Sequence, residues 1–85
     1  MIKISKLKDF QDLWCMALSA LGGKATKREI GNFVEDLIAD DLVSIPFEWR
    51  GSWQTDMGHQ KTNLKTKGII KVEKIGSKSY WSFAD

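Results

Sequence analysis

Residues 54–66 (QTDMGHQKTNLKT) carry polar side chains that would line one face of a helix. At about 100° per residue, this outer arc comprises Gln54, Thr55, Gly58, His59, Lys61, Thr62, Lys65 and Thr66. Amide, hydroxyl and imidazole groups can bond to base edges in the DNA major groove, and lysines can bind phosphates. The arc contains no acidic side chain, which favours a polyanionic partner. The alternative is that this face is simply exposed to solvent, because lysine and threonine are common on exposed helix faces.

The opposite side of the same helix offers a thin apolar stripe. Its members are Trp53, Met57, Gln60 and Leu64. We expect the helix to start between Ser52 and Asp56, since either can act as an N-cap, and to stop near Lys67 at Gly68. Gly58 costs up to about 1 kcal/mol relative to alanine inside a helix. That cost indicates either close approach of another surface or a helix that begins at Asp56.

Two amphipathic helices precede this segment. The first carries the stripe Leu7, Phe10, Leu13, Trp14, Ala17, Leu18 and Leu21, and Gly22-Gly23 should end it. The second begins at Thr26, where Glu29 completes a capping box, and it should end near residues 40–41. Its stripe is Ile30, Phe33, Val34, Leu37 and Ile38.

Residues 42–51 (LVSIPFEWRG) form a connector before the third helix. Pro46 disfavours helix at Ile45. We expect Phe47 and Trp49 to anchor the connector to the core.

The period of apolar residues changes to two after Gly68. Gly76-Ser77 predicts a two-residue type II′ turn of a β-hairpin. This turn fixes a register that pairs Val72 with Trp81, Ile70 with Phe83, Lys71 with Ser82 and Glu73 with Tyr80. A further short strand is possible at residues 24–25.

The order helix, helix, helix, hairpin predicts an α+β fold, the winged-helix variant of the helix-turn-helix. The 85 residues suffice for a single domain, residues 1–85, with one small core. A composition of 42% hydrophobic and 28% charged residues is that of a compact globular domain. The longest apolar-rich run, residues 13–23, is too short to cross a bilayer. We therefore expect a cytoplasmic protein.

The sequence gives little support for a metal site, a disulfide bond or a catalytic site. Cys15 is the single cysteine and His59 the single histidine, which excludes an internal disulfide and leaves too few ligands for a zinc site. The sequence offers no paired carboxylates and no nucleophile–base pair. We expect neither an independent enzyme nor a cofactor.

Positive charge is concentrated in the second half of the chain. Residues 1–48 hold 6 Lys/Arg and 8 Asp/Glu, whereas residues 49–85 hold 7 and 3. Such polarity suits a polyanion on one side of the fold.

The winged-helix arrangement assigns roles to particular side chains, because the third helix enters the major groove. The base-facing set would be Gln54, Thr55, His59 and Thr62. The phosphate-binding set would be Arg50, Lys61, Lys65, Lys74 and Lys78, with Ser77 at the hairpin tip. Arg50 could instead reach a guanine edge. Lys27 and Arg28 are poorly placed for their own helix dipole, which indicates a nearby phosphate or a mere surface position.

Residues 18–83 resemble the N-terminal domain of Mrr-type restriction endonucleases. The resembling stretches are LSALGGKATKREIGNFVEDL (18–37), MGHQKTNLKTKGII (57–70) and YWSF (80–83). The matching positions are Gly58, Leu64, Lys65, Gly68, Ile69 and Trp81. The resemblance implies a DNA-binding winged helix that, in that family, targets a nuclease to modified or specific sites.

Two departures from the family pattern lie where recognition would occur. His59 replaces a tryptophan after the helix glycine, and residues 45–54 replace a proline-serine-glycine turn. The Asp…Glu-x-Lys constellation of the nuclease is missing, since Glu73 and Lys74 are adjacent rather than spaced. Family specificity therefore cannot be transferred.

These observations predict a double-stranded DNA-binding domain, either a small regulator or the recognition module of a restriction-type protein with a separate nuclease domain. As a regulator it could form a homodimer through the apolar edge of helix one at Leu7, Phe10 and Trp14. The alternative is a winged helix that binds another protein and no nucleic acid.

Overall fold

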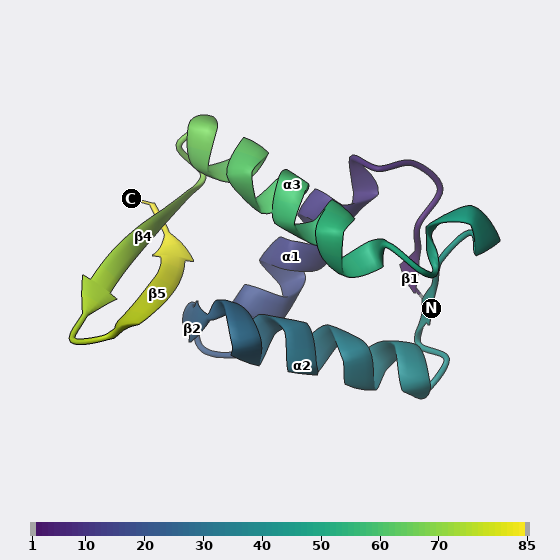
Figure 1. Cartoon of the computed structure of the whole chain (residues 1–85), viewed down its shortest axis with the longest axis horizontal. Helices are drawn as coiled ribbons and strands as arrows, with labels where there is room; N and C mark the ends of the chain where they lie inside the picture. The colour runs from purple at the N-terminus through teal and green to yellow at the C-terminus, as the bar shows by residue number, and fades with distance from the viewer. Residues whose placement is uncertain (1, 85) are drawn as a thin grey trace.

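The computed structural model describes residues 2–84 and combines α-helices with a small antiparallel sheet (Figure 1). In chain order the elements are β1 (Ile2–Lys3), α1 (Asp9–Ala20), β2 (Lys24–Thr26), α2 (Lys27–Ala39), β3 (Val43–Ser44), the 3-10 helix η1 (Phe47–Trp49), α3 (Trp53–Thr66), β4 (Ile70–Ile75) and β5 (Lys78–Phe83). The predicted α+β class and the three predicted helices are confirmed. The terminal residues 1 and 85 of the expected domain lie outside the described part.

Helix α1 is the centre of the core and contacts both α2 and α3. Its apolar stripe is almost completely buried, with Phe10, Ala17 and Leu18 at 0% exposure and Trp14 at 2%. This burial corrects the expectation of a dimer edge on helix one, because Phe10 and Trp14 belong to the core. Of that edge, Leu7 alone is exposed, and it precedes the helix.

Local signals place the ends of α1 and α2 as expected. Gly22 and Gly23 end α1 with positive φ angles of 93° and 86°. At the start of α2, the Glu29 amide donates to Thr26 Oγ1 over 3.2 Å, and the Thr26 amide donates to Glu29 Oε1 over 2.9 Å. These reciprocal bonds confirm the capping box.

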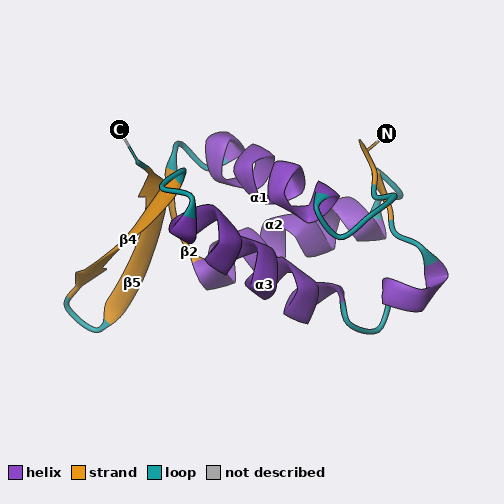
Figure 2. Ribbon diagram, turned by 90° about the horizontal axis from the view of Figure 1, so that it is seen from above, coloured by secondary structure: helices purple, strands orange, loops and turns teal. Residues whose placement is uncertain are grey.

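The predicted hairpin has the predicted register. Strands β4 and β5 pair Ile70 with Phe83 and Val72 with Trp81, around the two-residue turn at Gly76. Gly76 takes a φ of 64°, as the first position of a type II′ turn requires. The short strand β2 pairs with β5, which gives the sheet order β2-β5-β4 at one end of the helices (Figure 2).

The connector differs from the expectation in two respects. Its residues Val43–Ser44 form β3, which pairs in parallel with β1, a contact that the sequence did not indicate. Trp49 is half-buried and its ring lies 6.3 Å from that of Phe10, so it anchors the connector as expected. The same expectation is wrong for Phe47, whose exposure is 85%. The single turn of η1 directs only one of these two aromatic rings inward.

Among residues 2–84, every helix is too short or too polar to span a bilayer.

Candidate nucleic-acid interface

Helix α3 begins at Trp53 with Ser52 as its N-cap residue, which settles the start left open above. The Ser52 hydroxyl donates to Asp56 Oδ2 over 3.1 Å and makes no capping bond to a backbone amide. The predicted core stripe is confirmed: Met57, Gln60 and Leu64 are buried and Trp53 is half-buried. Gly58 thus lies in the second turn of the helix rather than in its first turn, where a start at Asp56 would have put it.

A polar network fixes α3 against α1. Gln11 Nε2 donates to Gln60 Oε1 over 2.7 Å, and Asn63 Nδ2 donates to the same oxygen over 3.1 Å. Lys67 Nζ donates to Gln11 Oε1 over 3.1 Å. Sequence reasoning placed Gln60 on the core stripe but missed this network, because its partner lies 49 positions away. The network therefore joins the inner side of α3 to α1 through side-chain hydrogen bonds.

The expected base-facing residues lie on the outer side of α3. Gln54, Thr55, His59 and Thr62 are all exposed. The Thr62 hydroxyl donates to the carbonyl oxygen of Gly58 over 3.2 Å. Its oxygen therefore remains an acceptor, while the other three side chains offer donors and acceptors to an approaching ligand.

Lys61 and Lys65 both lie over the aromatic ring of Trp81. Lys61 Nζ lies 4.7 Å from the centroid of the Trp81 ring, and Lys65 Nζ lies 6.0 Å from it. Trp81 belongs to β5 and packs edge-on against Trp14, with 6.0 Å between centroids. Both ammonium groups are thus held between α3 and the hairpin by cation–π attraction. The sequence put these lysines on a helix flank but gave no sign of this contact.

A third cation reaches the same place from α2. Partial burial lowers the pKa of Lys61, and the nearby charges of Lys27 and Lys65 lower it further. Like charges gathered in this way favour an anion between them, because its binding relieves their repulsion. The structure therefore brings together Lys27, Lys61 and Lys65, here called the lysine cluster.

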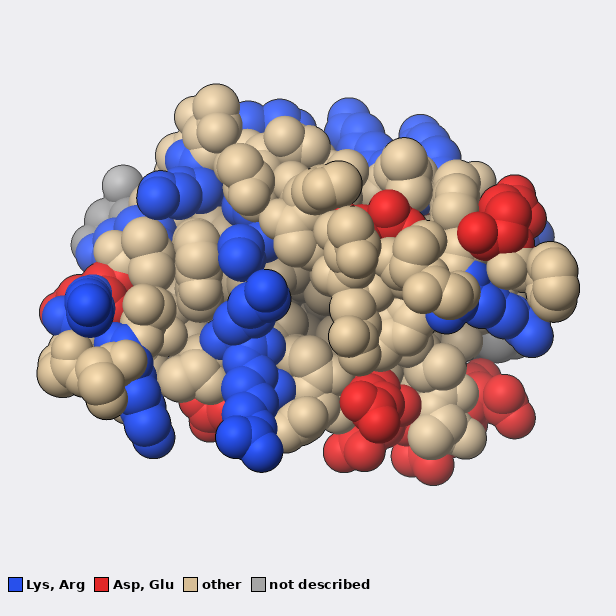
Figure 3. All heavy atoms as spheres, viewed as in Figure 1, with Lys and Arg blue, Asp and Glu red and all other residues tan. Residues whose placement is uncertain are grey.

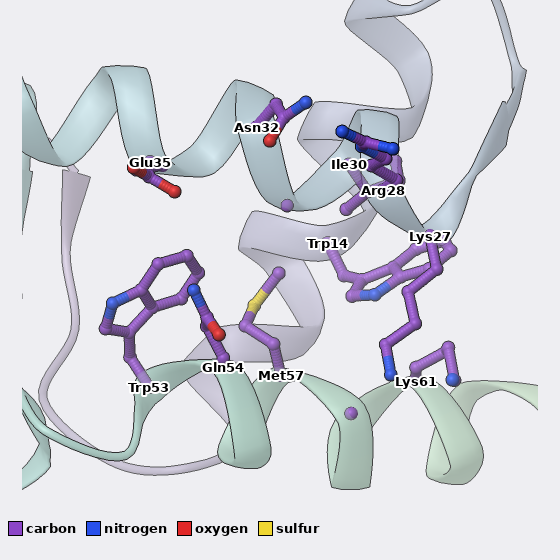
Figure 4. Close-up of a pocket in the computed structure, with 12 residues that line it drawn as sticks. Trp14, Lys27, Arg28, Ile30, Asn32, Glu35, Trp53, Gln54, Met57 and Lys61 are labelled. Carbon is purple, nitrogen blue, oxygen red and sulfur yellow. The ribbon is translucent and has the colours of Figure 1, made fainter.

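A groove of about 430 Å³ opens between α2 and α3 beside the lysine cluster. Its lining residues are Trp14, Lys27, Arg28, Ile30, Gly31, Asn32, Glu35, Trp53, Gln54, Met57, Gly58 and Lys61. In Figure 4, Lys27 and Lys61 come from facing helices and meet at one end of this groove, whereas Glu35 and Trp53 lie at the other. Four of the sequence-predicted residues line it: Lys27, Arg28, Gln54 and Lys61.

The hairpin tip presents exposed Lys74, Ser77 and Lys78. Lys78 lies close enough to the start of α2 for its charge to lower the pKa of Glu29, after the larger effects of the hydrogen bonds from Thr26. Lys78, the first residue of β5, therefore lies near the N-terminal end of α2, while the turn of the hairpin projects away from the helices (Figure 1).

Arg50 is not brought together with these cations. Its Nε donates to the carbonyl oxygen of Ile45 over 3.3 Å. Arg50 lines a second hollow with Asp41 and Val43, around the connector. This position gives no support for a guanine contact.

Charge is distributed unevenly on the face that carries α2 and α3. Figure 3 shows many Lys and Arg side chains toward the hairpin and along the middle of this face, and further ones at its upper edge and at the other end, where most of the Asp and Glu side chains also lie. The acidic end corresponds to the C-terminal part of α2 and the connector, which carry Asp36, Asp40, Asp41 and Glu48. The basic region therefore coincides with the lysine cluster and the hairpin.

Comparison with protein families, curated proteins and solved structures finds no match for this chain. Within residues 2–84, no group of three or more His, Cys, Asp or Glu side chains is arranged to hold a metal ion.

Proposed function

We propose that this chain is a winged-helix domain that binds double-stranded DNA, with α3 in the major groove and the β4–β5 hairpin as a wing on the phosphate backbone. The observation that carries the proposal is the lysine cluster: Lys27 and Lys61 come from facing helices and meet at one end of the groove, and Lys61 and Lys65 lie over the Trp81 ring, beside the acid-free outer arc of α3. The topology supports it, since β2 joins the hairpin sheet and α3 immediately precedes the hairpin, as in winged helices.

Each part of the basic surface takes a distinct role in this proposal. The lysine cluster and Arg28 hold the backbone of one strand at the outer rim of the groove between α2 and α3. Gln54, Thr55, His59 and Thr62 face the base edges. Lys74, Ser77 and Lys78 contact a more distant phosphate. The resemblance to Mrr-type proteins adds the proposal of a recognition module, in a cytoplasmic restriction-type protein with a nuclease domain or in a small regulator.

The experiment is a fluorescence-anisotropy titration of a labelled random-sequence duplex at about 50 mM and about 200 mM salt. We expect binding that weakens steeply with salt, since each neutralised phosphate contributes about −0.9 to the slope of log K against log salt. The double variant Lys61→Glu/Lys65→Glu should lose binding. The control Lys3→Glu/Lys8→Glu carries the same net charge change at exposed residues outside the basic region and should retain it.

Circular dichroism of both double variants distinguishes loss of contact from loss of fold. Absence of binding by the unmodified domain at the lower salt concentration, or equal loss in both variants, would contradict the proposal.

A second candidate function is a protein contact at the opposite end of the molecule. Phe47 is 85% exposed and precedes Glu48, and Leu42 is 49% exposed and follows Asp40 and Asp41 at the end of α2. An exposed aromatic ring next to acidic side chains suits a partner with an apolar pocket and a basic rim. This candidate gains support if the DNA titration is negative and Phe47→Ser abolishes association with such a partner.

A further inference from the structure

The groove between α2 and α3 combines an apolar floor with open walls. Trp14, Ile30 and Met57 form the floor and are each at most 5% exposed. The indole of Trp53 closes one end, and Figure 4 shows the Met57 side chain directed between the helices. Its volume of about 430 Å³ falls within the range of about 300–1,000 Å³ that is usual for small-molecule sites.

Both walls contain a glycine in the middle of a helix. Gly31 belongs to α2 and Gly58 to α3, and both line the groove. Neither has a positive φ angle, and a Cβ atom built on either would meet, apart from its chain neighbours and the backbone of its own helix, no atom of residues 2–84 within 4 Å. Each glycine costs about 0.8–1 kcal/mol of helix stability relative to alanine. Neither the backbone nor the packing of the described chain accounts for that cost, whereas an occupant that enters between the helices does.

The cations at one end of the groove indicate the chemical group that an occupant would place there. Lys27, Arg28 and Lys61 border the groove at one end, and among residues 2–84 none of them forms an ion pair. The amides of Asn32 and Gln54 border it further along. Such a site attracts an anionic group beside the cations and an apolar body over the floor.

We propose that this groove binds a small aromatic anion, with a flat ring over Trp14 and Met57 and between the two glycines, and a carboxylate or phosphate group against Lys27, Arg28 and Lys61. A DNA backbone fits the groove less well, because a sugar-phosphate chain has no flat apolar part to lie against the half-buried indole of Trp53 and between the two helix glycines. The DNA contact proposed above uses the outer rim of the same site.

Binding of the anion has a consequence for DNA, and this consequence rests on the proposed function. Lys27, Arg28, Gln54 and Lys61 belong both to the groove and to the proposed DNA surface. An anion in the groove neutralises Lys27, Arg28 and Lys61 and competes with the phosphate. The domain would then release DNA when the aromatic anion is present.

The first test is an NMR titration of the ¹⁵N-labelled chain with 2-naphthoate, up to about 5 mM, which covers dissociation constants of about 1 mM. We expect saturable shifts at the amides of Gly31 and Gly58. The neutral isostere 2-naphthylmethanol should bind at least about tenfold more weakly, because it lacks the charge-assisted bonds. Equal binding of both compounds, or no saturable shift at either glycine, would overturn the proposal.

The second test uses a variant whose larger side chain fills the groove. Gly58→Leu should weaken naphthoate binding at least about tenfold, while Ser19→Leu, at an exposed position of α1, should leave it unchanged. Thermal melts confirm that both variants fold. A duplex titration in the same buffer separates the two proposals: naphthoate binding without DNA binding upholds the groove and rejects the DNA function. DNA binding with unaltered naphthoate affinity in Gly58→Leu overturns the groove.

Discussion

Gln11 Nε2 lies 2.7 Å from Gln60 Oε1, and this buried hydrogen bond joins the first and third helices across 49 positions of the chain. Each amide group has a further partner, Lys67 for Gln11 and Asn63 for Gln60. The network orients α3, and with it the outer face that we propose contacts DNA. A buried polar pair of this kind is costly to break and easier to replace as a whole.

We therefore predict strong coupling between Gln11 and Gln60. Gln60→Leu alone should lower the free energy of unfolding by about 1–3 kcal/mol, because it leaves the Gln11 amide without its buried acceptor. The double variant Gln11→Leu/Gln60→Leu should lose less than the sum of the two single variants. Urea denaturation of all four proteins measures the coupling, and Gln54→Leu on the exposed face is the control. Additive losses would contradict a direct bond.

Two glycine-to-alanine changes should shift stability in opposite directions. Gly58→Ala should raise the free energy of unfolding by up to about 1 kcal/mol, because alanine favours the helix and its Cβ enters open space. Gly76→Ala should lower it by about 1–2 kcal/mol, because a φ of 64° is unfavourable for a residue with a Cβ. Thermal or urea denaturation measures both. A loss of stability in Gly58→Ala would show that the groove wall is more tightly packed than described.

Acid should weaken the start of α2 through Glu29. The hydrogen bonds from Thr26 hold the pKa of Glu29 below its ordinary value of 4.5. A carboxyl whose folded-state pKa is depressed contributes stability that is present above pH 4.5 and disappears as pH falls through the lower folded-state value. Glu29→Gln should therefore lose stability at neutral pH and show a shallower decline below that pH. Melting curves at a series of acidic pH values test this, and parallel curves for the two proteins would contradict it.

The wing and the third helix should contribute differently to DNA binding. Lys74→Gln/Lys78→Gln should weaken binding to all duplexes similarly and reduce the salt slope by about 0.9 per lost phosphate contact. Gln54→Ala or His59→Ala should instead change the discrimination between duplexes, by about 1–3 kcal/mol for each lost base contact. Anisotropy titrations on a panel of duplexes measure both effects. If the hairpin variant altered discrimination and the α3 variants did not, the assignment of roles would be reversed.

Much of the fold was accessible from the sequence, because its signals are local. The apolar stripes of period 3.6 gave the three helices, and the Thr26–Glu29 pair gave the start of the second. The Gly76-Ser77 turn fixed the whole hairpin register, since a slip of one residue would reverse every side chain. Gln60 was correctly placed on the inner side of α3, although its partner was not foreseen.

Tertiary structure decided the features that depend on residues far apart in the chain. Lys27 comes near Lys61 only because α2 and α3 both pack on α1 and face each other across the groove. Lys61 and Lys65 meet Trp81 only because the hairpin folds back against α3. Phe47 and Trp49 both have aromatic side chains and lie two positions apart. That Phe47 is exposed while Trp49 packs on Phe10 therefore depends on how η1 sits against α1. Helix and turn signals arise from residues that are neighbours along the chain, so they can be read from the sequence. The lysine cluster and the groove arise from packing between elements that are distant in the chain, and a local sequence pattern contains no information about that packing.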